Sequence, residues 1–426
     1  MESKKHKLAL ISYYFPPVPA VGCVRNYNIA QKLSSVYNTK IITRSYPVDS
    51  ESSFDIASLD VTRVYTLDEY FFKQKRKGNK KSSGTSIPSF LSRLTNSFPI
   101  NFFLWEGGLF YILGALVRLF RFRPAIVYSS YSPFSDHYIA FLYKSFFPKT
   151  IWIADFRDLH IDPEVDNVIL KKWQKGFDKT ILKKANFIIT VSKGLKEHLL
   201  SYNKKVMVVR NGLSDKLKEV SLSESIEEKL RNKFILTYTG LTYNGRRDPS
   251  LLFRALHQII IENPKYNDKI RLVYAGSEGD VWQEIAQVEK VKDFVIDLKR
   301  IPYQSSLALQ RYSHCNILLS WATKKQKGIL TGKFYEYLQA NKPIILLING
   351  VKDQEFEEIM FELNAGIVGY DDKDLKKLKT FLLKLLHQWE TKGNTQSNID
   401  PNTLNKYRWD SLIISLNDAI LQELKK

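Results

Sequence analysis

Short apolar segments alternate with amphipathic segments along most of the chain. The apolar segments are rich in β-branched and aromatic side chains, as is typical of buried parallel strands. They span residues 7–14, 39–43, 125–129, 150–154, 187–191 and 206–210 in the first half, and 234–239, 270–275, 294–298, 316–320, 343–348 and 365–369 in the second. Helical spacing follows at 24–34, 168–184, 192–200, 249–262, 281–291, 305–313 and 333–339. The pattern predicts repeated strand–helix units in an α/β protein.

A polar, charged stretch at 214–233 separates the two series of units. At 426 residues, the chain also exceeds what one hydrophobic core commonly supports. We therefore predict two Rossmann-like domains that face each other across a cleft, spanning residues 1–214 and 215–403. The final stretch, 404–426, is expected to be helical and to pack back on the first domain.

Composition narrows the class of protein. Hydrophobic residues make up 44% of the chain and aromatic residues 13%, which is enough for two cores and excludes a disordered protein. Cys23 and Cys315 lie too far apart in the sequence for a metal-binding motif or a disulfide framework. So few cysteines are typical of a reducing compartment, and we expect a cytoplasmic protein.

The longest apolar stretch, 98–122, is interrupted by Glu106, Arg118 and Arg121. A membrane-spanning helix needs about 20 largely uncharged residues. We interpret the stretch as a helix buried against a sheet, with a helix that dips into a membrane surface as the alternative. The apolar run at 8–14 is too short for a secretion signal and is interpreted as the first strand.

The formal net charge of +20 is unevenly distributed. Residues 1–215 hold 32 Lys and Arg against 17 Asp and Glu, whereas residues 216–426 hold 32 against 27. The basic run at 73–81 contributes to this excess and favours an anionic membrane surface or an anionic substrate. A solvated basic loop is the plain alternative. Nucleic acid is disfavoured, because no zinc-finger spacing, aromatic RNP motif or GXXG clamp is present.

Ligands of open α/β sheets bind beyond the carboxyl ends of the strands, so the loops there are candidate sites. The first strand is followed by a proline-rich loop with Gly22 and Arg25 at the start of a helix. A helix N-terminus offers free amides to an anion, and Arg25 would add a cation, which predicts a phosphate or acceptor loop. The alternative is an ordinary strand-to-helix turn, in which the glycine only satisfies the backbone geometry.

Four ionisable residues follow the strand at 150–154: Asp155, Arg157, Asp158 and His160. A carboxylate there could accept hydrogen bonds from sugar hydroxyls or deprotonate an acceptor hydroxyl, so we predict that these residues are catalytic. The alternative is a salt bridge of Arg157 with Asp155 or Asp158 at the end of the strand.

The first strand of the second series runs into Gly240, then Arg246 and Arg247 before a helix. Two guanidinium groups beside glycines suit a diphosphate, although both could simply be exposed. The glycine-rich turn at 275–279 could line the same cleft, but such turns are common without ligands. The acidic run at 371–374 is predicted to bind no metal, because it falls in a late surface turn.

The most informative segment contains Thr331, Gly332, Lys333 and Glu336. Thr331 and Gly332 stand at the mouth of a predicted helix, Lys333 lies in its first turn, and Glu336 projects from the same face. A cation for phosphate and a carboxylate for ribose hydroxyls, one turn apart, predict a nucleotide-sugar site. A surface Lys–Glu pair is the alternative, but the apolar flanks favour a mostly buried helix.

These segments together resemble the GT-B glycosyltransferases, specifically the retaining family 4 group that builds bacterial surface polysaccharides. The resemblance extends over nearly the whole chain. The motifs that carry it are SYYFPP…G..R at 12–25, DFRD at 155–158, TVSKGLKEHL at 190–199, VVRNG at 208–212, YTG…GRRDP at 238–249 and TGKFYEYLQANKPI at 331–344. The resemblance implies an N-terminal domain that binds the acceptor and a C-terminal domain that binds the nucleotide-sugar donor.

The resemblance also assigns individual residues. Arg246 and Arg247 match the second member of a basic pair that contacts the donor diphosphate, whereas Leu241 replaces the first. Glu336 matches a glutamate that binds ribose, but eight positions earlier Gly328 replaces a second glutamate. A histidine that approaches the donor sugar has no direct counterpart, so Asp155, Arg157 or His160 would cover that role.

The implied reaction moves a sugar from a UDP- or GDP-linked donor to a saccharide or lipid-linked oligosaccharide. We expect it to retain the anomeric configuration and to need no metal or other cofactor. The departing phosphate can accept the proton of the acceptor, with Asp158 as the best candidate for a protein base. The expected location is the cytoplasm, at the inner face of a bacterial membrane.

Three alternatives remain open at the level of sequence. The first is a nucleotide-sugar epimerase of the same fold, although epimerases need further carboxylates in the cleft. A phosphorylase is a weaker candidate, because no cofactor-lysine motif is found. The third is a non-catalytic binding subunit, which Gly328 in place of the glutamate keeps open.

Overall fold

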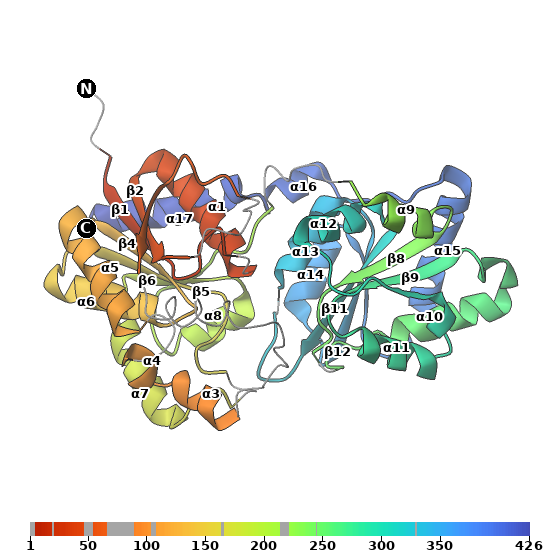
Figure 1. Cartoon of the computed structure of the whole chain (residues 1–426), viewed down its shortest axis with the longest axis horizontal. Coiled ribbons are helices and arrows are strands. Elements are labelled where there is room, and N and C mark those ends of the chain that lie inside the picture. The colour runs from red at the N-terminus through yellow and green to blue at the C-terminus, as the bar shows by residue number, and fades with distance from the viewer. Residues whose placement is uncertain are drawn as a thin grey trace, which may run out of the picture. The chain divides into compact units, whose positions relative to one another are not determined.

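The computed structural model describes residues 5–18, 21–46, 54–65, 89–103, 108–162, 166–213, 221–243, 245–328 and 330–426. The chain forms two compact units, which we call the N-terminal domain (Met1–Gly212 and Trp409–Lys426) and the C-terminal domain (Leu213–Arg408). Figure 1 shows the elements of both. The basic run at 73–81 lies outside the described residues.

The N-terminal domain is built on a seven-stranded, parallel sheet. In sheet order the strands are β3 (Asp60–Val64), β2 (Asn38–Arg44), β1 (Lys7–Ile11), β4 (Ile126–Ser130), β5 (Ile151–Phe156), β6 (Phe187–Thr190) and β7 (Val206–Val208). Its helices are α1 (Val21–Val36), α3 (Ser89–Thr95), α4 (Ile100–Phe103), α5 (Leu109–Phe122), α6 (Ser135–Phe146), α7 (Lys171–Leu182), α8 (Lys193–Leu199) and α17 (Trp409–Leu424).

Alternation along β1 separates the two faces of this sheet. Ala9 and Ile11 belong to the hydrophobic cluster that includes α5, α6 and α7. Leu8 and Leu10 point the other way, into the cluster formed with α1 and α17. The sheet is therefore buried on both faces, as near-continuous apolar strands predict.

The C-terminal domain is built on a six-stranded, parallel sheet. In sheet order the strands are β10 (Val295–Asp297), β9 (Ile270–Ala275), β8 (Phe234–Thr239), β11 (Cys315–Ala322), β12 (Ile344–Gly350) and β13 (Gly366–Gly369). Its helices are α9 (Glu224–Leu230), α10 (Ser250–Glu262), α11 (Gly279–Val288), α12 (Tyr303–Tyr312), α13 (Gly332–Ala340), α14 (Gln354–Glu362), α15 (Leu375–Lys392) and α16 (Pro401–Asn405), with 3-10 turns η1 (Pro264–Tyr266), η2 (Lys292–Phe294) and η3 (Asp372–Asp374).

Helices cover both faces of this second sheet as well. Helices α10, α11 and α15 share one large apolar cluster with β8, β9, β11 and β12. On the other face, α13 and α14 pack on β11 and β12, while α9 and α12 pack on β8 and β9. Both sheets follow Rossmann order, with the strand order reversing between β1 and β4 and between β8 and β11. Such reversal points are where α/β sheets bind ligands.

The predicted α/β class with two Rossmann-like domains is confirmed. β3 is absent from the prediction, because Asp60 and Arg63 interrupt its apolar character at the sheet edge. Residues 404–408 lie in the C-terminal domain, and α17, which begins at Trp409, belongs to the N-terminal domain.

The apolar stretch at 98–122 contains α4 and α5, and its burial differs from the prediction. Only one face of α5 is buried: Leu113 and Val117 on the opposite face are exposed. Across the part of the chain that the structure describes, no helix is both long and apolar enough to span a membrane.

Candidate functional site

The strand order reverses between β8 and β11, and α/β sheets have their ligand crevice at such a point. In this chain the crevice position brings together two segments that the sequence singled out. Gly240 follows β8 with a φ of 134°, a conformation that favours glycine. A Cβ atom built on Gly240 would lie 1.7 Å from Lys333 Nζ. The glycine therefore lets the ammonium group of α13 rest directly on the backbone at the end of β8.

Arg247 lies in the same crevice and is buried, with 4% of its surface exposed. Its guanidinium carbon lies 4.5 Å from the ring centre of Tyr243 and 5.1 Å from that of Trp321. Its Nε is buried and makes no hydrogen bond, and no ion pair of Arg247 is found among the described residues. Arg246, in contrast, is exposed.

Lys333 also lacks an acidic partner within ion-pair distance in the described part of the chain. Its ammonium group lies 5.6 Å from the ring centre of Tyr238. Burial, together with the nearby charge of Arg247, lowers the pKa of Lys333 to about 8, although Glu336 acts in the opposite direction. Two cations are thus held close together with no ion pair to either.

Thr331 precedes the first turn of α13 with an extended backbone and makes no side-chain capping hydrogen bond. Its Oγ1 is buried and has no hydrogen-bond partner in the part of the chain that the structure describes. The first amides of a helix have no partner within the helix, and they carry partial positive charge. Thr331, Gly332 and Lys333 therefore present hydrogen-bond donors at a point that already holds two cations.

Glu336, one turn further along α13, is held by two hydrogen bonds. Tyr303 donates its hydroxyl to Oε1 at 3.2 Å, and Gln310 donates Nε2 to Oε2 at 3.1 Å. Gln310 Nε2 is also within 3.1 Å of Thr239 Oγ1, which ties the carboxylate to the end of β8. Burial raises the pKa of Glu336, against the effects of Gln310, Lys333 and Tyr303.

Gly328, which stands where the family resemblance would place a glutamate, has a φ of 70°. Its amide donates to Asp353 Oδ2 at 2.7 Å. Asp353 is fully buried and also caps α14 by accepting from the amide of Phe356 at 3.2 Å. The turn before α13 is therefore fixed by Asp353, which the sequence analysis did not identify.

Further residues at this crevice were not among the predicted site residues, although the sequence had indicated that the glycine-rich turn at 275–279 could line it. Glu278, in the turn after β9, accepts a hydrogen bond from Thr242 Oγ1 at 2.9 Å and one from the amide of Tyr243 at 3.0 Å. It thereby braces the loop that carries Arg247. Glu278 could have been found in the sequence, because it belongs to a glycine-rich turn. Trp321, at the end of β11, was not predicted as a site residue.

In the N-terminal domain, Asp155 and Arg25 form a buried ion pair. Arg25 donates to Asp155 from Nη2 at 2.8 Å and from Nε at 2.9 Å. Arg25 Nη1 also lies 3.2 Å from the carbonyl oxygen of Arg210. The alternative of a salt bridge at this strand end was anticipated, but its cation comes from α1 and not from Arg157.

Arg157 lies over the first turn of α1. A Cβ atom built on Gly22 would lie 1.4 Å from Arg157 Nη1, so the absent side chain is what admits the guanidinium group. Arg157 donates from Nε and Nη2 to the carbonyl oxygen of Tyr131, at 3.0 and 2.8 Å. Gly22 and Arg157 were predicted as members of two separate sites, but the structure places them in contact at the start of α1.

The last two predicted catalytic residues differ in their surroundings. Asp158 is exposed and makes no hydrogen bond or ion pair with any other described residue. Desolvation of its carboxyl group by the surrounding protein nevertheless raises the pKa of Asp158, against the effect of the Arg157 charge. His160 is buried, with Nδ1 2.7 Å from Asp178 Oδ2 and Nε2 3.1 Å from the carbonyl oxygen of Asn96. Burial opposes protonation, but Asp178 raises the pKa of His160. Both nitrogens of His160 are engaged within the domain, whereas the carboxylate of Asp158 is accessible.

Two buried polar residues at the start of α6 were not anticipated. Asp136 accepts from the amide of Tyr13 at 2.8 Å and from the Tyr111 hydroxyl at 3.0 Å, and burial raises its pKa to about 7. His137 Nδ1 lies 2.8 Å from Ser129 Oγ, its Nε2 has no hydrogen-bond partner among the described residues, and burial lowers its pKa to about 3. They join the start of α6 to the loop after β1 and to β4 itself, the two strands between which the strand order reverses.

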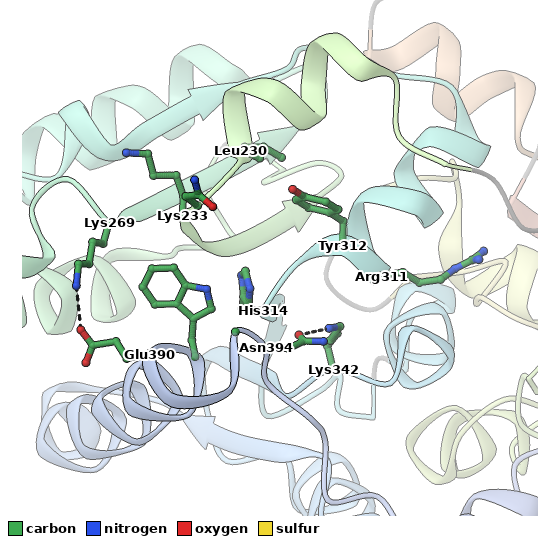
Figure 2. Close-up of a pocket in the computed structure, with 12 residues that line it drawn as sticks. Leu230, Lys233, Lys269, Arg311, Tyr312, His314, Lys342, Glu390 and Asn394 are labelled. Atoms are coloured by element: carbon green, nitrogen blue, oxygen red, sulfur yellow. Dashed lines mark hydrogen bonds and ion pairs between the residues drawn. The ribbon is translucent and has the colours of Figure 1, made fainter.

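A cavity of about 850 Å³ lies elsewhere in the C-terminal domain (Figure 2). Lys233, Lys269, His314 and Lys342 line it, each just before a strand of the sheet. It is therefore at the amino ends of the strands, opposite the crevice of Lys333. The described residues contain no cluster of His, Cys, Asp and Glu suited to a metal ion.

Comparison with known proteins addresses the fold. No family model matches the chain. Over 126 residues, the chain is 25% identical to an uncharacterized glycosyltransferase of Methanocaldococcus jannaschii, a match that covers 28% of this chain and 31% of that relative. The match thus spans about a third of the relative's length.

Several solved structures are similar over nearly the whole chain. Sucrose-phosphate synthase from Thermosynechococcus elongatus matches with a TM-score of 0.62 at 12% identity, over 99% of this chain and 100% of its own. The lipopolysaccharide outer core galactosyltransferase WaaB matches with 0.56 at 13%, over 98% and 99%. UDP-GlcNAc 2-epimerase from Neisseria meningitidis, bound to UDP-GlcNAc, matches with 0.53 at 13%, over 98% and 100%. The chain therefore has the GT-B fold, which is found in glycosyltransferases and in UDP-GlcNAc 2-epimerases alike.

Proposed function

We propose that this protein is a glycosyltransferase that uses a UDP- or GDP-linked sugar as donor and a saccharide or lipid-linked oligosaccharide as acceptor. One observation carries the proposal: Lys333 and Arg247 converge at the N-terminus of α13, one turn before a fixed carboxylate, and neither has a counter-ion among the described residues. A diphosphate would neutralise the two cations, and the ribose hydroxyls would donate to Glu336. We propose Thr331 and Gly332 as donors to the same phosphates and Gly240 as the position that gives them room.

In the proposed reaction, the bond from the anomeric carbon to the diphosphate oxygen breaks and a bond to the acceptor oxygen forms. Lys333, Arg247 and the helix amides would stabilise the charge that develops on the leaving diphosphate. This electrostatic role needs no metal, so we propose that the enzyme uses none. Arg246, which is exposed, would reach the diphosphate only as a mobile side chain.

The acceptor hydroxyl must also lose a proton in this reaction. We propose that the proton passes to the departing phosphate, as in a retaining reaction, or to Asp158, the accessible carboxylate among the predicted catalytic residues. Gly22 and Arg157 would offer a positively charged surface at the start of α1 to a phosphate group. For Arg25, Asp155 and His160, whose polar groups are engaged within the domain, we propose positioning roles.

A nucleotide-sugar epimerase is the second candidate, and the similarity to UDP-GlcNAc 2-epimerase favours it. The two activities differ in their requirement for an acceptor. An epimerase converts one nucleotide sugar into another without an acceptor, whereas a transferase releases nucleoside diphosphate when an acceptor is present. Incubation with UDP-GlcNAc alone, followed by chromatography of the nucleotide sugars, separates them.

Isothermal titration with UDP and with GDP tests donor binding. We expect one of the two to bind, and Lys333→Ala to weaken that binding about 10- to 100-fold, since a charged hydrogen bond contributes about 1.5–3 kcal/mol. Lys376→Ala, which removes an exposed lysine of α15, is the matched control and should bind like the wild type. If neither nucleotide binds the wild type, the proposed function is wrong.

A further inference from the structure

Helix α5 has two apolar faces, and only one of them is packed. Its buried face, which contacts the N-terminal sheet, consists of Tyr111, Ile112, Ala115, Leu116 and Leu119. On the other side lie Phe110, Leu113, Val117 and Phe120, with between 36% and 59% of their surface exposed. Their spacing of three, four and three residues places them in a single stripe along the helix.

The stripe continues onto the neighbouring helix. Phe146, the last residue of α6, is 67% exposed, and its ring centre lies 5.4 Å from that of Phe120. Figure 1 shows α5 and α6 in the same layer of the N-terminal domain, and the two helices are in contact. We call the exposed set Phe110, Leu113, Val117, Phe120 and Phe146 the α5 face. Single exposed apolar side chains are common on proteins, but a contiguous row of five marks an interaction surface.

The charges around the α5 face indicate what it binds. Residues 108–154 contain five basic side chains and one acidic side chain, Asp136. Asp136 is fully buried beside Tyr13, so it adds no negative charge to the surface. Arg121, Arg123 and Lys149 are exposed near the Phe120 end of the stripe. The one exposed acidic side chain near the described end of the stripe, Asp60, is paired with Lys40, whose ammonium group lies 5.4 Å from the ring centre of Phe122. An apolar stripe bordered mainly by basic side chains is the pattern of a helix that lies in the surface of an anionic membrane.

We propose that the α5 face docks the protein onto an anionic lipid bilayer, with the aromatic and aliphatic side chains entering the interface and the arginines contacting lipid phosphates. This takes up the alternative that the sequence left open for residues 98–122, and it places the basic contact beside α5, whereas the sequence-based expectation placed it in residues 73–81. The α5 face does not depend on donor chemistry, but it would bring the enzyme to a lipid-linked acceptor.

Co-sedimentation with vesicles tests the proposal on the full-length protein. The probes are vesicles of phosphatidylcholine alone and of phosphatidylcholine mixed with phosphatidylserine. We expect binding to the anionic vesicles, and at least a ten-fold weaker partition for the double variant Leu113→Gln, Val117→Gln. The matched control is Val288→Gln, Phe361→Gln, which removes two strongly exposed apolar side chains from the C-terminal domain and should not change binding.

A second variant separates the contribution of charge. Arg121→Gln with Lys149→Gln should weaken binding to the anionic vesicles and reduce its dependence on salt. If the wild type binds neither vesicle, or if Leu113→Gln, Val117→Gln binds as the wild type does, the proposal is wrong. It is also wrong if mass photometry shows a dimer that this variant abolishes, since the α5 face would then join two copies. Titration with UDP and GDP should be unchanged in all these variants, so a failure of docking is distinguishable from a failure of the proposed function.

Discussion

Lys333 and Arg247 illustrate how the fold keeps positive charge available at one point. A buried cation without a partner is costly, and proteins rarely retain one without a reason. Arg247 is stabilised by the faces of Tyr243 and Trp321, and Lys333 by the face of Tyr238. Neither contact neutralises the charge, so both cations remain ready for an anion.

The lowered pKa of Lys333 predicts a pH dependence of donor binding. A diphosphate binds the protonated amine, and the pKa of Lys333 in the free protein is about 8. Above that value the free protein has lost the proton and must regain it on binding, so affinity should fall by up to about tenfold for each further pH unit. The charge of the phosphates stays constant over this range, because their last pKa is about 6. Isothermal titration from pH 7 to 9.5 measures the fall.

Lys333→Arg is the control for this prediction, because a guanidinium group stays protonated throughout the range. The variant should bind with an affinity that is nearly constant between pH 7 and 9.5, even if its affinity at pH 7 is lower. A wild-type affinity that is equally constant would show that Lys333 does not contact the ligand as an ammonium ion.

At the residue scale, the sequence could predict relative placement where the residues concerned are neighbours in the chain. The spacing of Lys333 and Glu336 is a property of one helix, and it placed both at the crevice. The sequence could not show that Arg247 is buried while Arg246 is exposed, because this depends on Trp321 at the end of another strand. It also could not show Tyr303 and Gln310, which reach Glu336 from α12.

At the scale of elements, the ion pair of Arg25 and Asp155 connects α1 to β5. The two residues are 130 positions apart and both fully buried, so the sequence offered only the adjacent Arg157 as a partner. Replacing Arg25 alone by Met should destabilise the protein by about 3–5 kcal/mol, because the carboxylate of Asp155 is left buried and unpaired. Replacing both, with Arg25→Met and Asp155→Leu, should cost much less. Urea unfolding of the two single variants and the double variant gives the coupling energy.

The exposed pair of Lys40 and Asp60 is the control for this experiment. It joins neighbouring strands at the sheet edge, and Lys40→Met should change stability by less than about 1 kcal/mol. Equal losses for Arg25→Met and for the double variant would contradict the prediction, since the cost would then come from lost packing and not from an unpaired charge.

Helices and strands were predicted best where a sequence pattern is compatible with a single type of element. Twelve apolar segments predicted as strands all lie on strands of the two sheets, because a buried parallel strand has little freedom in composition. The burial of the stretch at 98–122 was harder to predict, because an apolar sequence does not show how many faces of the helix are packed against the protein. The burial of Leu116 and the exposure of Leu113, three positions away on α5, are decided by the position of the sheet.

At the scale of the whole molecule, the chain leaves the N-terminal domain at Gly212 and returns to it at Trp409. Trp409 packs against Gly212, because a Cβ atom built on Gly212 would lie 3.0 Å from the Trp409 ring. The residue at which the chain leaves the domain is therefore in contact with the residue at which it returns. Leu416 and Ile420 of α17 are completely buried in the cluster with α1 and the N-terminal sheet. The last helix is therefore a structural part of the first domain, although the C-terminal domain separates them in sequence.

This connection predicts that one residue near the C-terminus controls the stability of the N-terminal domain. Leu416→Ala should destabilise that domain by about 2–5 kcal/mol, because it removes a buried side chain and leaves a cavity between α17 and α1. Ile414→Ala, on the exposed side of the same helix, is the matched control and should change stability by less than about 0.5 kcal/mol. Hydrogen exchange read by mass spectrometry locates the effect: in Leu416→Ala, exchange should accelerate in β1 and α1 but not in β8 and β9. Equal acceleration in both domains would mean that they unfold as a single unit, and unchanged exchange in β1 would mean that α17 contributes nothing to the core on which it packs.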